Sequence, residues 1–196
     1  LGERRWPLPG IAHAMTTLQV KGFAWLNVLT CVREQFGAET VTALKAAFPQ
    51  HSMFFDESAV LPVGWVPGEL HCGAIEWVTR EKYSGSLDGA QTIGTLLASR
   101  NLSSTFRSLS RLEDLRTALA STQRAFSQFY SRGVMAFTVK DVVLEARLTD
   151  FPAASPIMGN CLGAGLVAFL RAGHLDAKLL KVDVGPDSIA YDVKLR

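Results

Sequence analysis

Histidine and cysteine are the residues of this sequence that could hold a metal ion or a haem iron. His71 and Cys72 are adjacent, and the neighbouring Leu70 and Ile75 mark one side of a helix as apolar. A single histidine can be the axial ligand of a haem, so His71 is the best candidate for that role. A histidine packed into the protein core explains the same pattern. The four histidines are isolated and the three cysteines lie far apart, so their spacing predicts no metal site, and the cysteines fit small buried side chains.

No serine or glycine motif of this sequence has the context that catalysis requires. The serine nucleophile of many hydrolases follows a strand within Gly-x-Ser-x-Gly, whereas Ser84-Gly85-Ser86 follows a helical pattern. No phosphate-binding glycine loop follows a strand either. We therefore expect no catalytic residues and a protein that is not an enzyme.

Three arginines could form an anion-binding clamp. Arg100, Arg107 and Arg111 flank Ser103, Ser104 and Thr105. Guanidinium groups pair well with phosphate or carboxylate, because their donors form a planar fork. A solvent-exposed loop between two helices explains the same composition.

Aromatic side chains are concentrated in the first half of the chain. Together with one histidine they are numerous enough to line a pocket for a flat or lipid-like ligand. The candidate pocket residues are Trp25, Phe54, Phe55, Trp65, His71 and Trp77. Ordinary core packing and a dimer interface are the alternatives.

The elements that would position these residues are clearest in the last third of the chain, where two β-hairpins are predicted around one helix. The first hairpin pairs residues 135–139 with 142–149, and the second pairs 180–184 with 189–195. Apolar residues alternate with polar ones, as in strands that bury one face. The expected buried residues are Val142, Leu144, Ala146, Leu148, Leu180, Val182, Val184, Ile189, Tyr191, Val193 and Leu195.

The helix between the hairpins, about Pro156 to Ala172, is the expected cover of this sheet. Gly159 and Gly163 lie four residues apart on one face of it. Glycine inside a helix costs about 1 kcal/mol relative to alanine, so this face is expected to meet a closely packed neighbour. That neighbour is either the sheet or the same helix of a second subunit, which makes the two glycines candidate interface residues.

The first part of the chain is predicted to be helical from Phe23 onward. Residues 1–17 contain Pro7, Pro9 and Gly10 and have no sustained period, so they form an extension or linker. Residues 18–196 then form a single domain. Its expected helices are residues 23–36, 38–48, 68–82, 88–100 and 111–130. The predicted fold class is α+β, with the N-terminal helices packed on the antiparallel β-β-α-β-β unit.

Composition excludes several classes of function. The net charge is +2, from 20 basic and 18 acidic residues spread along the chain, so nothing marks a nucleic-acid-binding surface. No apolar run reaches the roughly 18 residues that span a bilayer. Unpaired cysteine spacing fits a reduced, cytoplasmic protein. The hydrophobic fraction of 48% is high, which favours an internal pocket or a buried oligomer surface.

Several short strings occur in an order that resembles an uncharacterised paralogous domain family of myxobacteria. The likeness covers about residues 18–196, and its specificity lies in order and spacing. The strings are Val20-Lys21-Gly22, Val32-Arg33-Glu34-Gln35-Phe36-Gly37, Leu61-Pro62 to Trp65, Phe129-Tyr130-Ser131-Arg132-Gly133 and Leu148-Thr149-Asp150-Phe151-Pro152.

That family is in turn similar to haem-NO-binding domains, the 4-vinyl-reductase small-molecule-binding domain and TRAPP transport-particle subunits. The resemblance implies helices packed on an antiparallel sheet, and a ligand-binding or dimerising regulatory module. Two departures count against a metal site or haem. The last hairpin has Ser188-Ile189-Ala190 where the reductase type carries cysteines. Tyr130-Ser131-Arg132 has the residue types of the haem-propionate motif Tyr-x-Ser-x-Arg at a different spacing, so the cofactor stays unassigned.

Two functional hypotheses follow. The first is a non-enzymatic sensor or regulatory domain that holds a small hydrophobic ligand in an aromatic-lined pocket. The second is a protein-interaction or dimerisation module without a small ligand, with a homodimer or another protein as partner.

Overall fold

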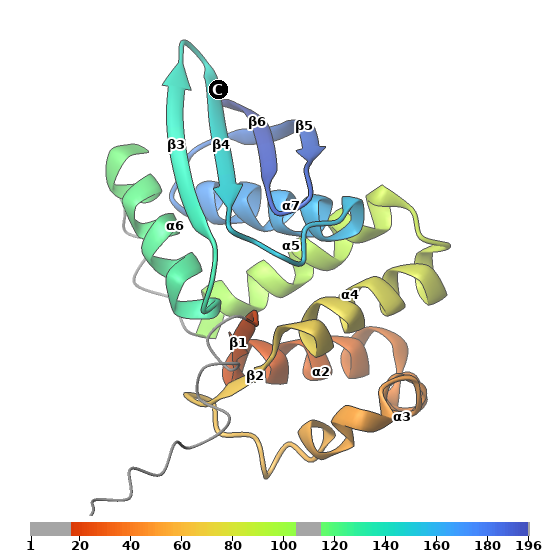
Figure 1. Cartoon of the computed structure of the whole chain (residues 1–196). Helices are drawn as coiled ribbons and strands as arrows, with labels where there is room; N and C mark the ends of the chain where they lie inside the picture. Colours follow the sequence, from red (N-terminus) through yellow and green to blue (C-terminus); the bar gives the residue numbers. More distant parts are fainter. Residues whose placement is uncertain (1–16, 105–114, 196) are drawn as a thin grey trace, which may run out of the picture.

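A computed structural model describes residues 17–104 and 115–195, so residues 1–16 of the expected extension and the clamp residues Arg107 and Arg111 lie outside its described part. The first half of the chain is mainly helical, and the longer strands β3 to β6 all lie in the second half (Figure 1). The helices are α2 Gly22–Phe36, α3 Ala38–Ala47, the 3-10 helix η1 Pro49–Phe55, α4 Gly68–Tyr83, α5 Leu87–Ser104, α6 Leu115–Phe129 and α7 Pro156–Ala172. The strands are β1 Gln19–Lys21, β2 Trp65–Pro67, β3 Val134–Lys140, β4 Val143–Thr149, β5 Ala177–Val184 and β6 Ile189–Leu195.

The last third of the chain, from β3 to β6, is the predicted β-β-α-β-β unit. Its four strands form one antiparallel sheet in the order β3-β4-β6-β5, so the two hairpins meet where β4 pairs with β6. Tyr191 and Val193 are buried and Lys194 is exposed, as the alternation predicts. Figure 1 shows α7 lying along one face of this sheet. The α+β fold class is therefore confirmed.

The strand β5 differs from the prediction in its start and in its phase. It begins at Ala177, and its register with β6 shifts between Leu179 and Lys181. The extra residue, Leu180, is 53% exposed, so its prediction as a core residue is wrong. A β-bulge places one additional residue in a strand and reverses the facing of those beyond it. In the first hairpin Val142 is likewise exposed, because it lies in the turn between β3 and β4.

α7 packs on the sheet through its small residues. A side chain at Gly159 would meet Val182 and Val184 at 3.0 Å, and one at Gly163 would meet Leu179 and Tyr191 at the same distance. Both glycines are buried by strands of the same chain, so the sheet, the first of the two expected neighbours, meets this face of α7. On another side α7 crosses α5 in the most extensive helix–helix packing of the described residues.

A second, two-stranded sheet was not predicted. β1 pairs antiparallel with β2, although the two are more than 40 residues apart in sequence. Val20 of β1 also forms a bridge with Tyr130, at the entry to the large sheet. Three-residue strands leave no alternation to detect, so only the tertiary pairing identifies them. This small sheet fixes the N-terminal helices to the start of β3.

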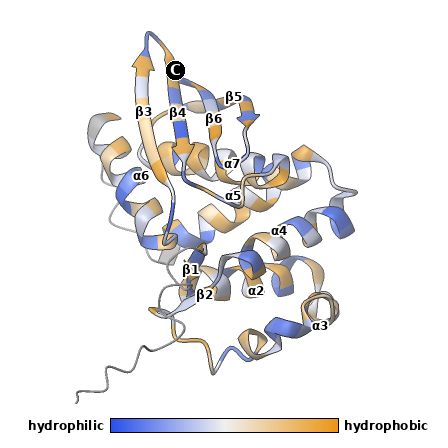
Figure 2. Ribbon diagram, in the orientation of Figure 1, coloured by the Kyte–Doolittle hydropathy of each residue, from blue (hydrophilic) through white to orange (hydrophobic). Residues whose placement is uncertain are grey.

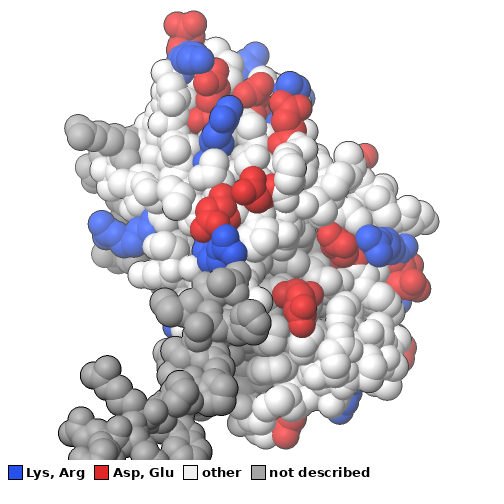
Figure 3. Space-filling model, in the orientation of Figure 1, with Lys and Arg blue, Asp and Glu red and all other residues white. Residues whose placement is uncertain are grey.

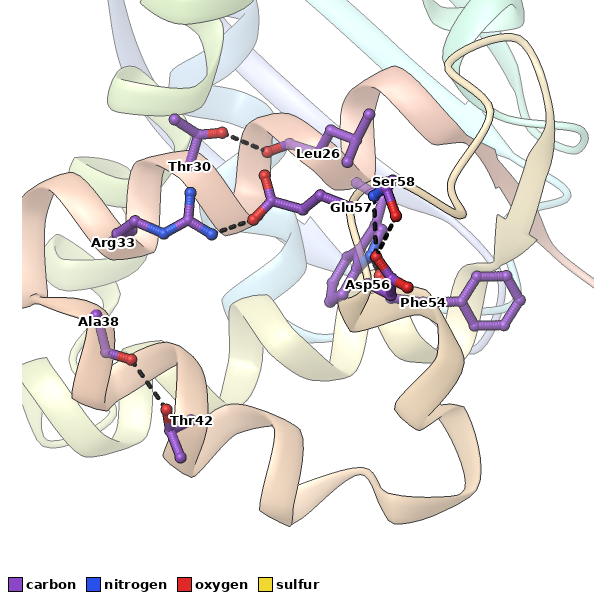
Figure 4. A network of polar contacts seen from close by, with 10 residues as sticks. Leu26, Thr30, Arg33, Ala38, Thr42, Phe54, Asp56, Glu57 and Ser58 are labelled. Atoms are coloured by element: carbon purple, nitrogen blue, oxygen red, sulfur yellow. Dashed lines mark hydrogen bonds and ion pairs between the residues drawn. The ribbon is translucent and has the colours of Figure 1, made fainter.

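The connector between α3 and β2 is held against α2 by polar contacts (Figure 4). Arg33 of α2 pairs with Glu57, and Asp56 accepts hydrogen bonds from the backbone and side chain of Ser58. The pKa of the Asp56 carboxyl is lowered, mainly because of the Ser58 side-chain hydrogen bond. Val60 of this connector is buried.

The visible face of the molecule is mixed in charge, and α6 is amphipathic. Figure 2 shows α6 with a hydrophobic side and a hydrophilic side, and the visible face in Figure 3 has basic and acidic side chains interspersed. Among residues 17–104 and 115–195, no helix combines the length and apolar character needed to cross a membrane.

Candidate ligand cavity

The described residues line a cavity of about 140 Å³, partly open to solvent, between α5, α6 and α7. α4 and the start of β3 complete its wall. Most of the lining is apolar and aromatic, and it includes Leu97, Phe126, Phe129, Met135, Leu166 and Phe169. Ala98 and Gly165 leave space where α5 and α7 face each other, whereas Gly94 allows the two helices to approach closely.

A few polar side chains interrupt this apolar wall. They are His71, Asn101, Thr122, Tyr130 and Cys161. The rings of His71 and Tyr130 meet edge to face, with centroids 5.8 Å apart. Nδ1 of His71 lies 4.0 Å from Sγ of Cys72, whereas no hydrogen-bond partner among the described residues reaches its Nε2 or the Tyr130 hydroxyl.

Burial keeps these groups uncharged. Desolvation lowers the pKa of His71 to about 4, so its imidazole is neutral at pH 7. Burial, the largest cause, raises the pKa of the Tyr130 phenol well above its usual range and that of the Cys161 thiol to about 12. The cavity therefore offers neutral hydrogen-bonding groups and no ionised one among these three.

Of the six residues predicted to line a pocket, the cavity contains His71 alone. Trp25 is fully buried elsewhere, where it packs edge to face on Phe55 with ring centroids 5.3 Å apart. Its Nε1 donates to the Phe54 carbonyl oxygen at 2.7 Å. These three residues hold η1 against α2, so their role is core packing.

The two remaining tryptophans also lie away from the cavity lining. Trp65 of β2 is exposed, and the ammonium group of Lys21 sits 3.7 Å from its ring centroid. Trp77 of α4 is partly buried against the core. The first arginine of the predicted clamp, Arg100, is paired with Glu34 at 2.5 Å.

Sequence reasoning missed most of the aromatic lining, which comes from the end of α6 and from α7. Phe126 and Phe129 lie in the helix that the sequence predicts over residues 111–130, and Tyr130 follows α6 directly. Periodicity shows which side of a helix is apolar, but not whether that side meets a neighbour or a void.

Comparison with known proteins identifies a shared fold but no family for this chain. No family model matches the chain, and no curated protein matches it. Among solved structures, the Fe(II) unliganded H-NOX protein from K. algicida superposes with a TM-score of 0.65, at 13% identity, over 90% of this chain and 96% of that chain. An H-NOX protein from S. oneidensis in the Fe(II)NO state gives a TM-score of 0.64, at 11% identity, over 90% of this chain and 99% of that chain.

The chain thus has an α+β architecture with a cavity beside its sheet. More particularly, it has the H-NOX fold. The expected similarity to haem-NO-binding domains is confirmed at the level of the fold.

The described residues of this cavity do not fit a haem, the group whose distortion has been probed in the H-NOX family. A cavity of about 140 Å³ is well below the roughly 300–1,000 Å³ of pockets for larger ligands. No lysine or arginine occurs in the part of the lining that the structure describes, so none is available there for propionates. Ser131 instead accepts a hydrogen bond from the Gln19 amide at 2.9 Å, and Arg132 pairs with Asp150. Within the described ranges, no group of three or more histidine, cysteine, aspartate or glutamate side chains could hold a metal ion.

Proposed function

We propose that this chain is a non-enzymatic sensor domain that holds a small hydrophobic molecule, and not haem, in the cavity between α5, α6 and α7. The observation that carries the proposal is the cavity itself. Its volume of about 140 Å³ is close to that of an engineered apolar cavity of about 150 Å³ that stays dry and binds benzene. The H-NOX fold supports a sensor role by analogy, which is a weaker warrant.

A contact between helices gives the cavity a route to the N-terminal half. Asn101 lines the cavity, and its Oδ1 accepts a hydrogen bond from Asn27 of α2 at 2.5 Å. The adjacent Arg100 pairs with Glu34 of the same helix. A ligand that moves the end of α5 would therefore act on α2 through two polar contacts.

Native mass spectrometry of freshly purified protein, followed by solvent extraction, tests whether a ligand is carried. Thermal unfolding with added benzene tests the cavity directly, because a ligand that binds only the folded state raises Tm. Gly165→Leu provides the blocked variant: a Cβ at Gly165 would meet Ala98 and the Gly94 carbonyl oxygen only at 4.0 Å, so the larger side chain enters the cavity. Gly165→Ala is its matched control.

We expect benzene to raise the Tm of the wild type and of Gly165→Ala, and to leave that of Gly165→Leu unchanged. A purely apo mass together with no benzene effect on the wild type would refute the proposal. An equal Tm rise in Gly165→Leu would place binding outside this cavity.

Exposed apolar residues support the second candidate function, a protein-interaction or dimerisation module. Leu61 is 69% exposed and Val63 is 79% exposed, and both lie in the connector before β2. Exposed Met53 and Trp65 belong to the same part of the chain. Light scattering across a concentration series tests this function, with Leu61→Ser plus Val63→Ser as the variant. A ligand-free dimer that this variant dissociates would favour the interaction module.

A further inference from the structure

Two buried polar groups of the cavity wall have unused hydrogen-bonding capacity. His71 is 4% exposed and Tyr130 is 8% exposed, and both line the cavity. Nδ1 of His71 has the Cys72 sulfur beside it at 4.0 Å, but its Nε2 and the Tyr130 hydroxyl have no partner in the part of the chain that the structure describes. Buried polar groups of folded proteins are normally satisfied by protein, water or ligand.

The hydrogen-bonding character of these groups follows from their surroundings. Burial raises the pKa of the Cys72 thiol, so it keeps its proton and can direct it toward Nδ1 of His71. In that tautomer Nε2 carries the hydrogen and donates. The Tyr130 phenol is neutral as well, and its hydroxyl can donate or accept.

The remaining wall limits the kind of molecule that these groups can serve. The apolar lining near them includes Phe126, Met135 and Leu166. A carboxylate would lose its hydration there, and the described lining offers no cation to compensate for that loss. A purely apolar molecule would leave both polar groups without a partner.

We propose that the cavity selects an uncharged molecule of about the size of a benzene ring that carries one hydroxyl group, with this hydroxyl placed between His71 and Tyr130. A hydroxyl suits this position because it accepts from one neighbour and donates to the other. The proposal rests on the proposed function and adds the chemical class of the ligand.

Calorimetric titration of the full chain with phenol, benzene and benzoate at pH 7 tests this class. Tyr130→Phe removes one hydroxyl and keeps the ring. Tyr191→Phe is the matched control, since the Tyr191 hydroxyl is also buried without a partner but does not belong to the cavity lining. His71→Leu is a second variant that removes the other polar group.

We expect phenol to bind the wild type at least as tightly as benzene, and benzoate to bind at least tenfold more weakly. Tyr130→Phe should weaken phenol about fivefold, the effect of one hydrogen bond, and change benzene less than twofold. His71→Leu should act in the same direction, whereas Tyr191→Phe should change neither affinity.

The results separate the two proposals. Three outcomes would overturn the ligand class and leave the cavity as a binding site. The first is binding of benzene without binding of phenol, and the second is benzoate binding equal to that of phenol. The third is a phenol affinity that both Tyr130→Phe and His71→Leu leave unchanged. Failure of both phenol and benzene to bind the wild type would overturn the proposed function, and this inference with it.

Discussion

Two glycines in the α5–α7 crossing should respond oppositely to the same substitution. A Cβ on Gly94 of α5 would lie 2.0 Å from the Cys161 carbonyl oxygen, whereas a Cβ on Gly165 of α7 would meet nothing closer than 4.0 Å. Both residues lie inside helices, so Gly→Ala brings each the same intrinsic gain of about 1 kcal/mol. The difference between the two variants therefore reports packing alone.

The magnitude follows from what each methyl group meets. Overpacking costs about 1–3 kcal/mol, and the upper end applies at Gly94 because the obstacle is backbone of α7. Gly94→Ala should then destabilise the protein by about 2 kcal/mol, and Gly165→Ala should stabilise it by about 1 kcal/mol. For a chain of 196 residues, a difference of about 3 kcal/mol separates the Tm values by roughly 6–12 °C.

Urea unfolding followed by circular dichroism gives the free energies of unfolding, and calorimetry gives the Tm values. Equal m-values would show that both variants unfold from equally compact states. If Gly94→Ala were as stable as Gly165→Ala, the two helices would not approach as closely as described, and the reasoning about this crossing would be wrong.

Three further results are expected. Ser155→Ala should lower the free energy of unfolding by about 1 kcal/mol, because the Ser155 hydroxyl caps α7 by accepting a hydrogen bond from the Met158 amide at 3.1 Å. Ser155→Thr should keep the cap, and urea unfolding of both variants tests this. Val193→Asp should destabilise by about 4 kcal/mol through a buried unpaired charge and Lys194→Asp by less than about 0.5 kcal/mol, so equal Tm values would contradict the strand register. The pKa of His71 is about 4 in the folded protein and about 6.5 in the unfolded chain. The contribution of His71 to the free energy of unfolding should therefore be fully present above pH 6.5 and fall by about 3 kcal/mol toward pH 4. Urea unfolding at a series of pH values tests this, and His71→Leu should flatten the dependence.

The sheet could be predicted from sequence because one of its faces is buried and the other is not. Leu144, Ala146 and Leu148 alternate with polar residues, and all three are buried. The phase of β5 could not be predicted, because Leu179 and Leu180 are both apolar and either could face the core. The bulge that exposes Leu180 is set by pairing with β6, which is a tertiary contact.

The cavity was beyond sequence reasoning for a related reason. A composition rich in aromatics predicted a pocket in the N-terminal half, but Trp25 and Phe55 fill their space by packing on each other. The cavity lies instead where α5, α6 and α7 meet, and its aromatic residues, such as Phe126 and Phe169, come from the other half of the chain. Whether apolar side chains fill a space or surround one depends on how far apart the backbones lie.

The glycines of α7 allow one step more. Gly159 and Gly163 face strands at 3.0 Å, so close packing on the sheet accounts for both. Gly165 has no such neighbour, although it carries the same cost inside a helix. An alanine there would be more stable, and a leucine would fill the space between α5 and α7. Close packing therefore accounts for Gly159 and Gly163 but not for Gly165, where a small side chain of either kind keeps the proposed ligand site open.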